Sequence, residues 1–174
     1  MIHKATDLIS KTFDDYDVKY RIVEAGDASV VEAGFVIDAG PAVVVRFISK
    51  DDDNDVAVRV FDLINHIPLS KKYAMMEACN TLSAKVRFYK FFLNRDNGIN
   101  VEADLPEQTS DECVGECCFE LFARIMSILT NEYHILAETL YGSKSQPSHK
   151  PLEILQALKE LRDTPIIVGD EDTH

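Results

Sequence analysis

The sequence is short of positive charge, of long apolar runs and of glycine-rich loops. It contains 18 Lys and Arg residues against 30 Asp and Glu residues, which gives a formal net charge of -12. Nucleic-acid binding depends on contacts from Lys and Arg to phosphate, so a basic or neutral protein is the better partner. No stretch approaches the roughly 18 apolar residues of a spanning helix, and Met1 to Leu8 lacks the apolar core of a signal peptide. We therefore expect a cytoplasmic protein that binds neither nucleic acid nor membrane.

Signatures of catalysis are also missing. Gly26, Gly34 and Gly40 are isolated, so none belongs to a glycine-rich phosphate loop. Nucleophilic catalysis needs a nucleophile, a base and a group that orients the base, all placed within reach of one another. The five histidines have no such partners at triad or metal spacing: His3, His66, His134, His149 and His174. We expect no catalytic residue, no metal and no cofactor.

Four cysteines allow a metal or redox site as the alternative. Cys113 and Cys117 are one helical turn apart, and Cys118 follows directly. A zinc site needs two separated ligand pairs, and the second pair is missing here. Reduced cysteine is among the most buried residue types, so we favour structural roles for these three and for Cys79. A metal-dependent or redox sensor, or a small enzyme, that uses Cys113, Cys117 and Cys118 remains the competing hypothesis.

An acidic run at residues 51–55 has the beginning of a calcium loop. Asp51, Asp53 and Asp55 alternate as the first ligands of an EF-hand do. Val56 and Asp62, however, stand where such a loop requires Gly and a bidentate Glu. A block of like charge usually stays in water, so we predict a solvated hairpin tip.

The rest of the chain is organised around Tyr73–Pro106, which predicts a helix followed by two strands. Ser70 has the right residue type for a helix cap. The branched and aromatic residues of 86–93 favour a strand, Gly98 favours a turn, and residues 99–105 alternate like a strand with one wet face. One helical face then carries four apolar residues at spacings of three and four: Met75, Ala78, Cys79 and Leu82.

Periodicity predicts the other elements in turn. An amphipathic helix covers residues 3–16, and strands cover 20–24, 30–38, 42–49 and 56–64. Thr109 and Glu112 have the spacing of a capping box that starts a long helix, which should run to about Tyr141 and stop at Gly142. Antiparallel strands interrupted by helices predict an α+β fold with helices on one face of an antiparallel sheet.

The domain organisation follows from composition. Residues 1–142 form the domain, in the order helix, three or four strands, helix, two strands, helix. Residues 143–151 are rich in Ser and Pro and are typical of a linker. Residues 152–174 predict a short last helix and an acidic tail. The helix is marked by Leu152, Leu155, Leu158 and Leu161.

Two sets of side chains are candidate contact surfaces. In a strand over 86–93, alternation separates Val86, Phe88, Lys90 and Phe92 from a second set. The second set is Arg87, Tyr89, Phe91 and Leu93. If the first set faces the core, the second set is exposed and is a candidate partner-binding surface. The alternative is that the second set is covered within the monomer. The long helix carries a second apolar row, expected to pack on another helix or on a second subunit: Phe119, Phe122, Met126, Leu129 and Tyr133.

Residues from about Val18 to Tyr141 resemble the YbjN family of bacterial proteins, whose domain is similar to the type III secretion chaperones. The carrying features are VFDLINHIP at Val60–Pro68, ACNTLSAKVRF at Ala78–Phe88, FLNRDNGINVEADLP at Phe92–Pro106 and the long closing helix. This pattern is diffuse and includes no catalytic motif. The resemblance implies a chaperone-like fold and a structural role for Asn80.

Together these observations favour a non-enzymatic protein-binding module, either chaperone-like or a regulatory adaptor. Its acidity and its likeness to secretion chaperones favour a protein client and a homodimer. The client itself is not identified by any motif.

Overall fold

The computed structural model describes residues 1–38, 40–106 and 109–142. In that part the chain forms a six-stranded antiparallel sheet, three α-helices and a 3-10 turn, which confirms the predicted α+β class. The strands lie in the order β1-β2-β3-β4-β6-β5. The elements are α1 (Lys4–Asp15), β1 (Tyr20–Ala25), β2 (Ala28–Val36), β3 (Ala42–Ser49), β4 (Val56–Ile64), η1 (Leu69–Lys71), α2 (Lys72–Lys85), β5 (Lys90–Leu93), β6 (Ile99–Leu105) and α3 (Asp111–Tyr141).

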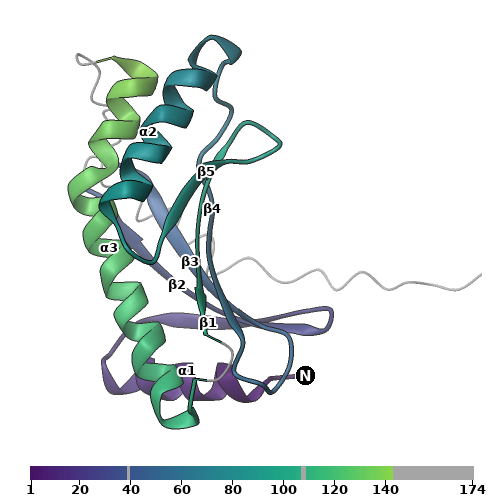
Figure 1. Ribbon diagram of the computed structural model, residues 1–174. Coiled ribbons are helices and arrows are strands. Elements are labelled where there is room, and N and C mark those ends of the chain that lie inside the picture. Colours follow the sequence, from purple (N-terminus) through teal and green to yellow (C-terminus); the bar gives the residue numbers. More distant parts are fainter. Residues whose placement is uncertain (39, 107–108, 143–174) are drawn as a thin grey trace, which may run out of the picture.

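The helices lie on one face of the sheet (Figure 1), and the core lies between the two layers. Val31, Phe47, Val58 and Ala103 face one another across neighbouring strands, and all four are buried. Burying one such large side chain contributes about 1.5–3 kcal/mol. The sheet therefore presents a continuous apolar face that the helices cover.

A glycine allows the first and last helices to touch. At Gly115 in α3, an added Cβ would lie 1.9 Å from the Thr12 hydroxyl oxygen and 2.8 Å from the Leu8 carbonyl oxygen in α1. Figure 1 shows α1 crossing the beginning of α3. Only a residue without a side chain permits this approach.

The helix-free face of the sheet carries a row of charged side chains. The strand registers place Arg21, Glu32, Arg46, Arg59 and Glu102 side by side on β1, β2, β3, β4 and β6. Arg21 and Arg46 donate hydrogen bonds to the two carboxylate oxygens of Glu32 at 2.6 and 2.7 Å. The pairs of Glu32 with Arg21 and Arg46 stabilise the register of β1, β2 and β3.

Several expected boundaries are confirmed and others are wrong. The strands at 42–49 and 56–64 and the helix end at Tyr141 are as predicted, and Gly142 follows with φ 85°. Ser70 does not cap α2, which continues from the turn η1 without a side-chain cap. The capping box is also wrong, because Ser110 is the N-cap and the Thr109 hydroxyl donates to the Pro106 carbonyl instead.

The predicted strand over 86–93 is shorter than expected. Only Lys90–Leu93 pair with β6, while residues 86–89 form the link from α2. No helix of the described residues is long and apolar enough to cross a membrane. The predicted linker 143–151 and the predicted helix and tail 152–174 lie outside the described residues.

Candidate functional site

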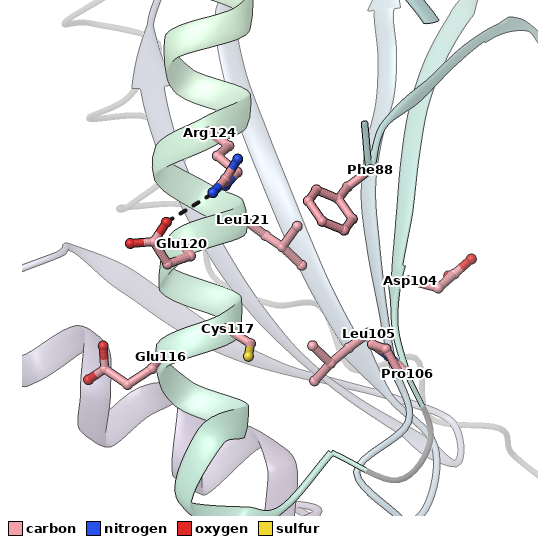
Figure 2. A pocket seen from close by; sticks show the side chains of 9 residues that line it. All are labelled: Phe88, Asp104, Leu105, Pro106, Glu116, Cys117, Glu120, Leu121 and Arg124. Carbon is pink, nitrogen blue, oxygen red and sulfur yellow. Dashed lines mark ion pairs between the residues drawn. The ribbon is translucent and has the colours of Figure 1, made fainter. Parts of the chain in front are cut away.

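An apolar groove of about 310 Å³ lies between α3 and the end of β6, with Phe88 at its mouth. Figure 2 shows Cys117 and Leu121 pointing from α3 toward Phe88, Leu105 and Pro106. We call this feature the α3–β6 groove. It is lined by Phe88, Asp104, Leu105, Pro106, Glu116, Cys117, Glu120, Leu121 and Arg124.

Tyr89 holds the link beside this groove in place. Its side chain is 1% exposed, and its hydroxyl donates a 2.7 Å hydrogen bond to the Leu121 carbonyl oxygen. Burial raises the pKa of Tyr89 well above its usual range, which keeps the hydroxyl protonated as a donor. With Tyr89 turned inward, the neighbouring Phe88 remains 55% exposed. An exposed aromatic ring beside an apolar groove is the typical anchor of a contact surface.

The charges around the α3–β6 groove are mostly negative. Glu116 and Glu120 leave α3 on the side away from Leu105 and Pro106, and the Asp104 side chain points away from α3 (Figure 2). The Asp104 carboxylate pairs with Arg59 at 2.7 Å. Arg124 lies 3.7 Å from Glu120, and its guanidinium stands 5.7 Å from the centre of the Phe88 ring. The groove thus has an apolar floor, and the three carboxylates of its lining residues point outward and are paired, Asp104 with Arg59, Glu116 with Tyr16 and Glu120 with Arg124.

Glu116 also connects the groove to α1. The Tyr16 hydroxyl donates to a Glu116 carboxylate oxygen at 3.1 Å, and the Tyr16 ring stacks on Phe119 at 3.9 Å. That hydrogen bond, with the negative charge of Glu116, raises the pKa of Tyr16. The beginning of α3 is therefore held against α1 on one side and forms the groove on the other.

The prediction that Tyr89 and Phe91 belong to a partner-binding surface is wrong. Tyr89 and Phe91 are buried in the core, because Phe91 pairs with the core residue Val101 and Tyr89 lies under α3. Leu93 is half-buried against the core, and Arg87 is exposed. The predicted alternation does not hold across the link before β5, where Arg87 and Phe88 are both exposed, and Phe88 of the other set is its exposed aromatic residue.

The second apolar row of α3 packs within the monomer. Phe122 contacts Phe13 at 5.8 Å and Phe35 at 6.0 Å between ring centroids. Leu129 and Tyr133 are also buried, and Phe119 stacks on Tyr16 of α1 as described above. Met126 is the most exposed residue of this row, at 38% exposed.

The three clustered cysteines lie in different environments. Cys113 is exposed, Cys117 is half-buried in the floor of the groove, and Cys118 faces the core. Burial raises the pKa of the Cys117 thiol and, more strongly, that of Cys118. Within residues 1–38, 40–106 and 109–142, no group of three His, Cys, Asp or Glu side chains is placed to hold a metal ion.

One histidine has an acidic partner that the sequence did not indicate. The His3 ring lies with Nδ1 3.5 Å from an Asp52 carboxylate oxygen and Nε2 2.6 Å from the Asp27 carbonyl oxygen. Because a main-chain carbonyl occupies the second ring nitrogen, this pair is not arranged to activate a nucleophile. Asp52 also accepts the Lys4 amide, so the acidic loop anchors the start of α1.

The chain matches no protein-family model and no curated protein in the comparisons. The resemblance to the YbjN family therefore stays a prediction.

Proposed function

We propose that this protein is a non-enzymatic protein-binding module, chaperone-like or a regulatory adaptor, that takes an apolar segment of its partner in the α3–β6 groove. The observation that carries this proposal is Phe88, held outward at 55% exposed beside the floor formed by Leu105, Cys117 and Leu121. Covering such apolar surface contributes roughly 25 cal/mol per Å² of area removed from water.

The groove also indicates the chemistry of the partner. An apolar anchor would lie on the floor, and basic residues that flank this anchor would reach the exposed Glu116 and Glu120 outside the groove. The formal net charge of -12 draws a basic segment toward the protein and repels an acidic one. The expected partner segment is therefore apolar with flanking Lys or Arg.

A photo-crosslinking amino acid in place of Phe88 tests the proposal in cells of the source organism. Tyr73 provides the matched control position, because it is 74% exposed on α2 and does not line the groove. We expect a crosslinked protein from position 88 and not from position 73. The Cys117→Glu substitution, which places a charge on the floor of the groove, should remove that crosslink without changing the thermal unfolding midpoint by more than a few degrees.

Equal crosslinks from both positions, or a position-88 crosslink that survives Cys117→Glu, would contradict the groove as the binding site. A crosslink only to a second copy of this chain would show self-association there in place of client binding. Alanine at Phe88 provides the in vitro counterpart, with an expected loss of about tenfold or more in partner affinity.

A further inference from the structure

Two cysteines that differ in exposure lie one helical turn apart at the start of α3. Cys113 is exposed, Cys117 is half-buried in the floor of the α3–β6 groove, and Cys79 and Cys118 are buried. We propose that a hydroperoxide oxidises Cys113 and Cys117 to a reversible disulfide, and that this bridge weakens the hold of the groove on the partner. The effect on the partner rests on the proposed function, whereas the bridge itself does not.

The spacing of the two cysteines brings their side chains near each other. Residues four apart lie on the same side of a helix, with Cβ atoms about 5–6 Å apart. A disulfide needs Cβ atoms about 3.5–4.5 Å apart, so closing the bridge draws the two residues together by roughly 1–2 Å. Strained and exposed disulfides are the ones that are readily reduced again. This spacing therefore suits a bridge that forms and opens reversibly.

The first turn of α3 can accommodate this movement. Ser110 is the N-cap but makes no side-chain cap hydrogen bond, and the Cys113 amide donates to the Ser110 carbonyl oxygen at 2.8 Å. Because the Cys113 side chain is exposed, its displacement disturbs little packing. The start of the helix stays in place, since Asp111 pairs with Lys4 at 2.6 Å and accepts a hydrogen bond from Asn54 at 2.7 Å.

The difference in exposure assigns a role to each thiol. The exposed Cys113 thiolate attacks one oxygen of the hydroperoxide, the O–O bond breaks, and the departing oxygen takes up the proton that Cys113 had lost. Cys113 becomes a sulfenic acid. The Cys117 sulfur then attacks the Cys113 sulfur, and the hydroxyl group leaves with the Cys117 proton as water. Two thiols are oxidised to one disulfide, and one hydroperoxide is reduced to an alcohol, or to water, plus water.

The surroundings of Cys117 favour this order of events. Burial raises the pKa of the Cys117 thiol, and the negative charges of Cys113, Glu116 and Glu120 raise this pKa further. A sulfenic acid is neutral, so oxidation of Cys113 removes one of these charges. Because the thiolate is the attacking form, Cys117 becomes a better nucleophile only after Cys113 has reacted.

The bridge changes the groove because Cys117 forms part of its floor. Figure 2 shows the Cys117 sulfur pointing from α3 toward Leu105. In the bridge this sulfur turns back along α3 toward Cys113, which does not line the groove. The partner's apolar anchor then loses a contact on the floor beside Leu121.

The bridge is tested in the reduced full-length protein. The protein is treated with increasing hydrogen peroxide, the remaining thiols are blocked with iodoacetamide, and the denatured chain is cleaved after glutamate. Cleavage after Glu116 separates Cys113 from Cys117 and Cys118 unless a disulfide joins the two peptides, which mass spectrometry detects. We expect joined peptides in the parent and in Cys118→Ala, and none in Cys113→Ser or Cys117→Ser. Circular dichroism checks that all variants are folded, and a dithiol reductant should separate the peptides again.

Three results would overturn the bridge: conversion of Cys113 to sulfinic acid without joined peptides, joined peptides that persist in Cys117→Ser, or a disulfide only between two copies of the chain. The effect on the partner has its own measurement. Peroxide should lower the yield of the position-88 crosslink at least threefold in the parent and leave it unchanged in Cys113→Ser.

The two measurements keep the two proposals apart. If the peptides join but the crosslink yield does not change, the control of the groove is refuted. If the peptides do not join but position 88 captures a partner, this inference fails and the proposed function stands. If the peptides join but position 88 captures no partner even without peroxide, the proposed function fails and the disulfide stands.

Discussion

The Tyr89 hydroxyl donates a 2.7 Å hydrogen bond to the main-chain carbonyl oxygen of Leu121 in the middle of α3. This contact joins the link before β5 to the helix that forms the opposite wall of the α3–β6 groove. It fixes Tyr89 inward and therefore Phe88 outward. The contact surface at Phe88 is thus set by a buried hydrogen bond at the next residue.

Replacing Tyr89 with Phe should weaken both stability and partner binding. The variant keeps the ring but removes the donor, so we expect a loss of about 1–2 kcal/mol in the free energy of unfolding. The affinity for the partner should fall by more than the loss of folded protein accounts for, because Phe88 is less firmly positioned in the variant. Urea unfolding measures the first effect, and the position-88 crosslink yield measures the second. An unchanged stability would show that the hydrogen bond contributes little.

The Gly115→Ala substitution should destabilise the packing of α1 on α3. The added Cβ would meet the Thr12 hydroxyl and the Leu8 carbonyl oxygen at distances shorter than van der Waals contact. Forcing the helices apart should cost about 2–3 kcal/mol, more than the gain in helix propensity from Gly to Ala of about 1 kcal/mol. Adding Thr12→Ser to Gly115→Ala should not restore the lost stability, because the hydroxyl at position 12 and the Leu8 carbonyl oxygen would still meet the added Cβ. Thermal unfolding of the single variant, with exposed Thr130→Ala as a control, checks this expectation.

Glu32 should stabilise the fold at neutral pH and lose this effect in acid. Burial raises the pKa of Glu32, but the hydrogen bonds from Arg46 and Arg21 outweigh it, so the pKa lies below its usual value of 4.5. A lowered folded-state pKa means that the stabilisation is present above the unfolded-state pKa and is lost as pH falls through the folded-state value. We expect Glu32→Gln to cost about 1–2 kcal/mol at pH 7.

The pH dependence separates charge from packing at this position. Protonated Glu32 resembles Gln, so the difference in unfolding free energy between the parent and Glu32→Gln should shrink as pH falls below 4.5. Glu102→Gln serves as the control, because Glu102 is more exposed and lies 4.0 Å from Arg59. A difference that does not change with pH would show that the carboxylate charge is not the cause.

The four thiols should react in the order of their exposure. Cys113 is exposed, Cys117 is half-buried, and Cys79 and Cys118 are buried with pKa values raised by burial, that of Cys79 to about 11. We expect Cys113 to label first, and Cys79 and Cys118 only on unfolding, since the thiolate is the reactive form. Rapid labelling of Cys118 in the folded protein would contradict its place in the core.

The elements of the fold could be predicted because their causes are local. Alternation of buried and more exposed side chains over 42–49 and 56–64 predicts strands wherever one face of the sheet is buried. Gly142 ends a helix because glycine readily takes a positive φ. Caps were less predictable, since Ser110, Ser70 and Thr109 all have suitable side chains, yet none of them makes a side-chain cap hydrogen bond and Ser110 is the N-cap only by its backbone position. The residue types at 86–93 predicted a strand, but only four of them find a partner strand in β6.

Residue types alone predict a strand over 86–93 and an apolar stripe along α3. Which side chains of 86–93 face the core could not be predicted, because that depends on the residues that pack against them from distant parts of the chain. The Leu121 carbonyl and Val101 lie opposite Tyr89 and Phe91, so those residues are buried and Phe88 is left exposed. The α3–β6 groove exists for the same physical reason, since it joins residues that are distant in sequence and that only packing brings together.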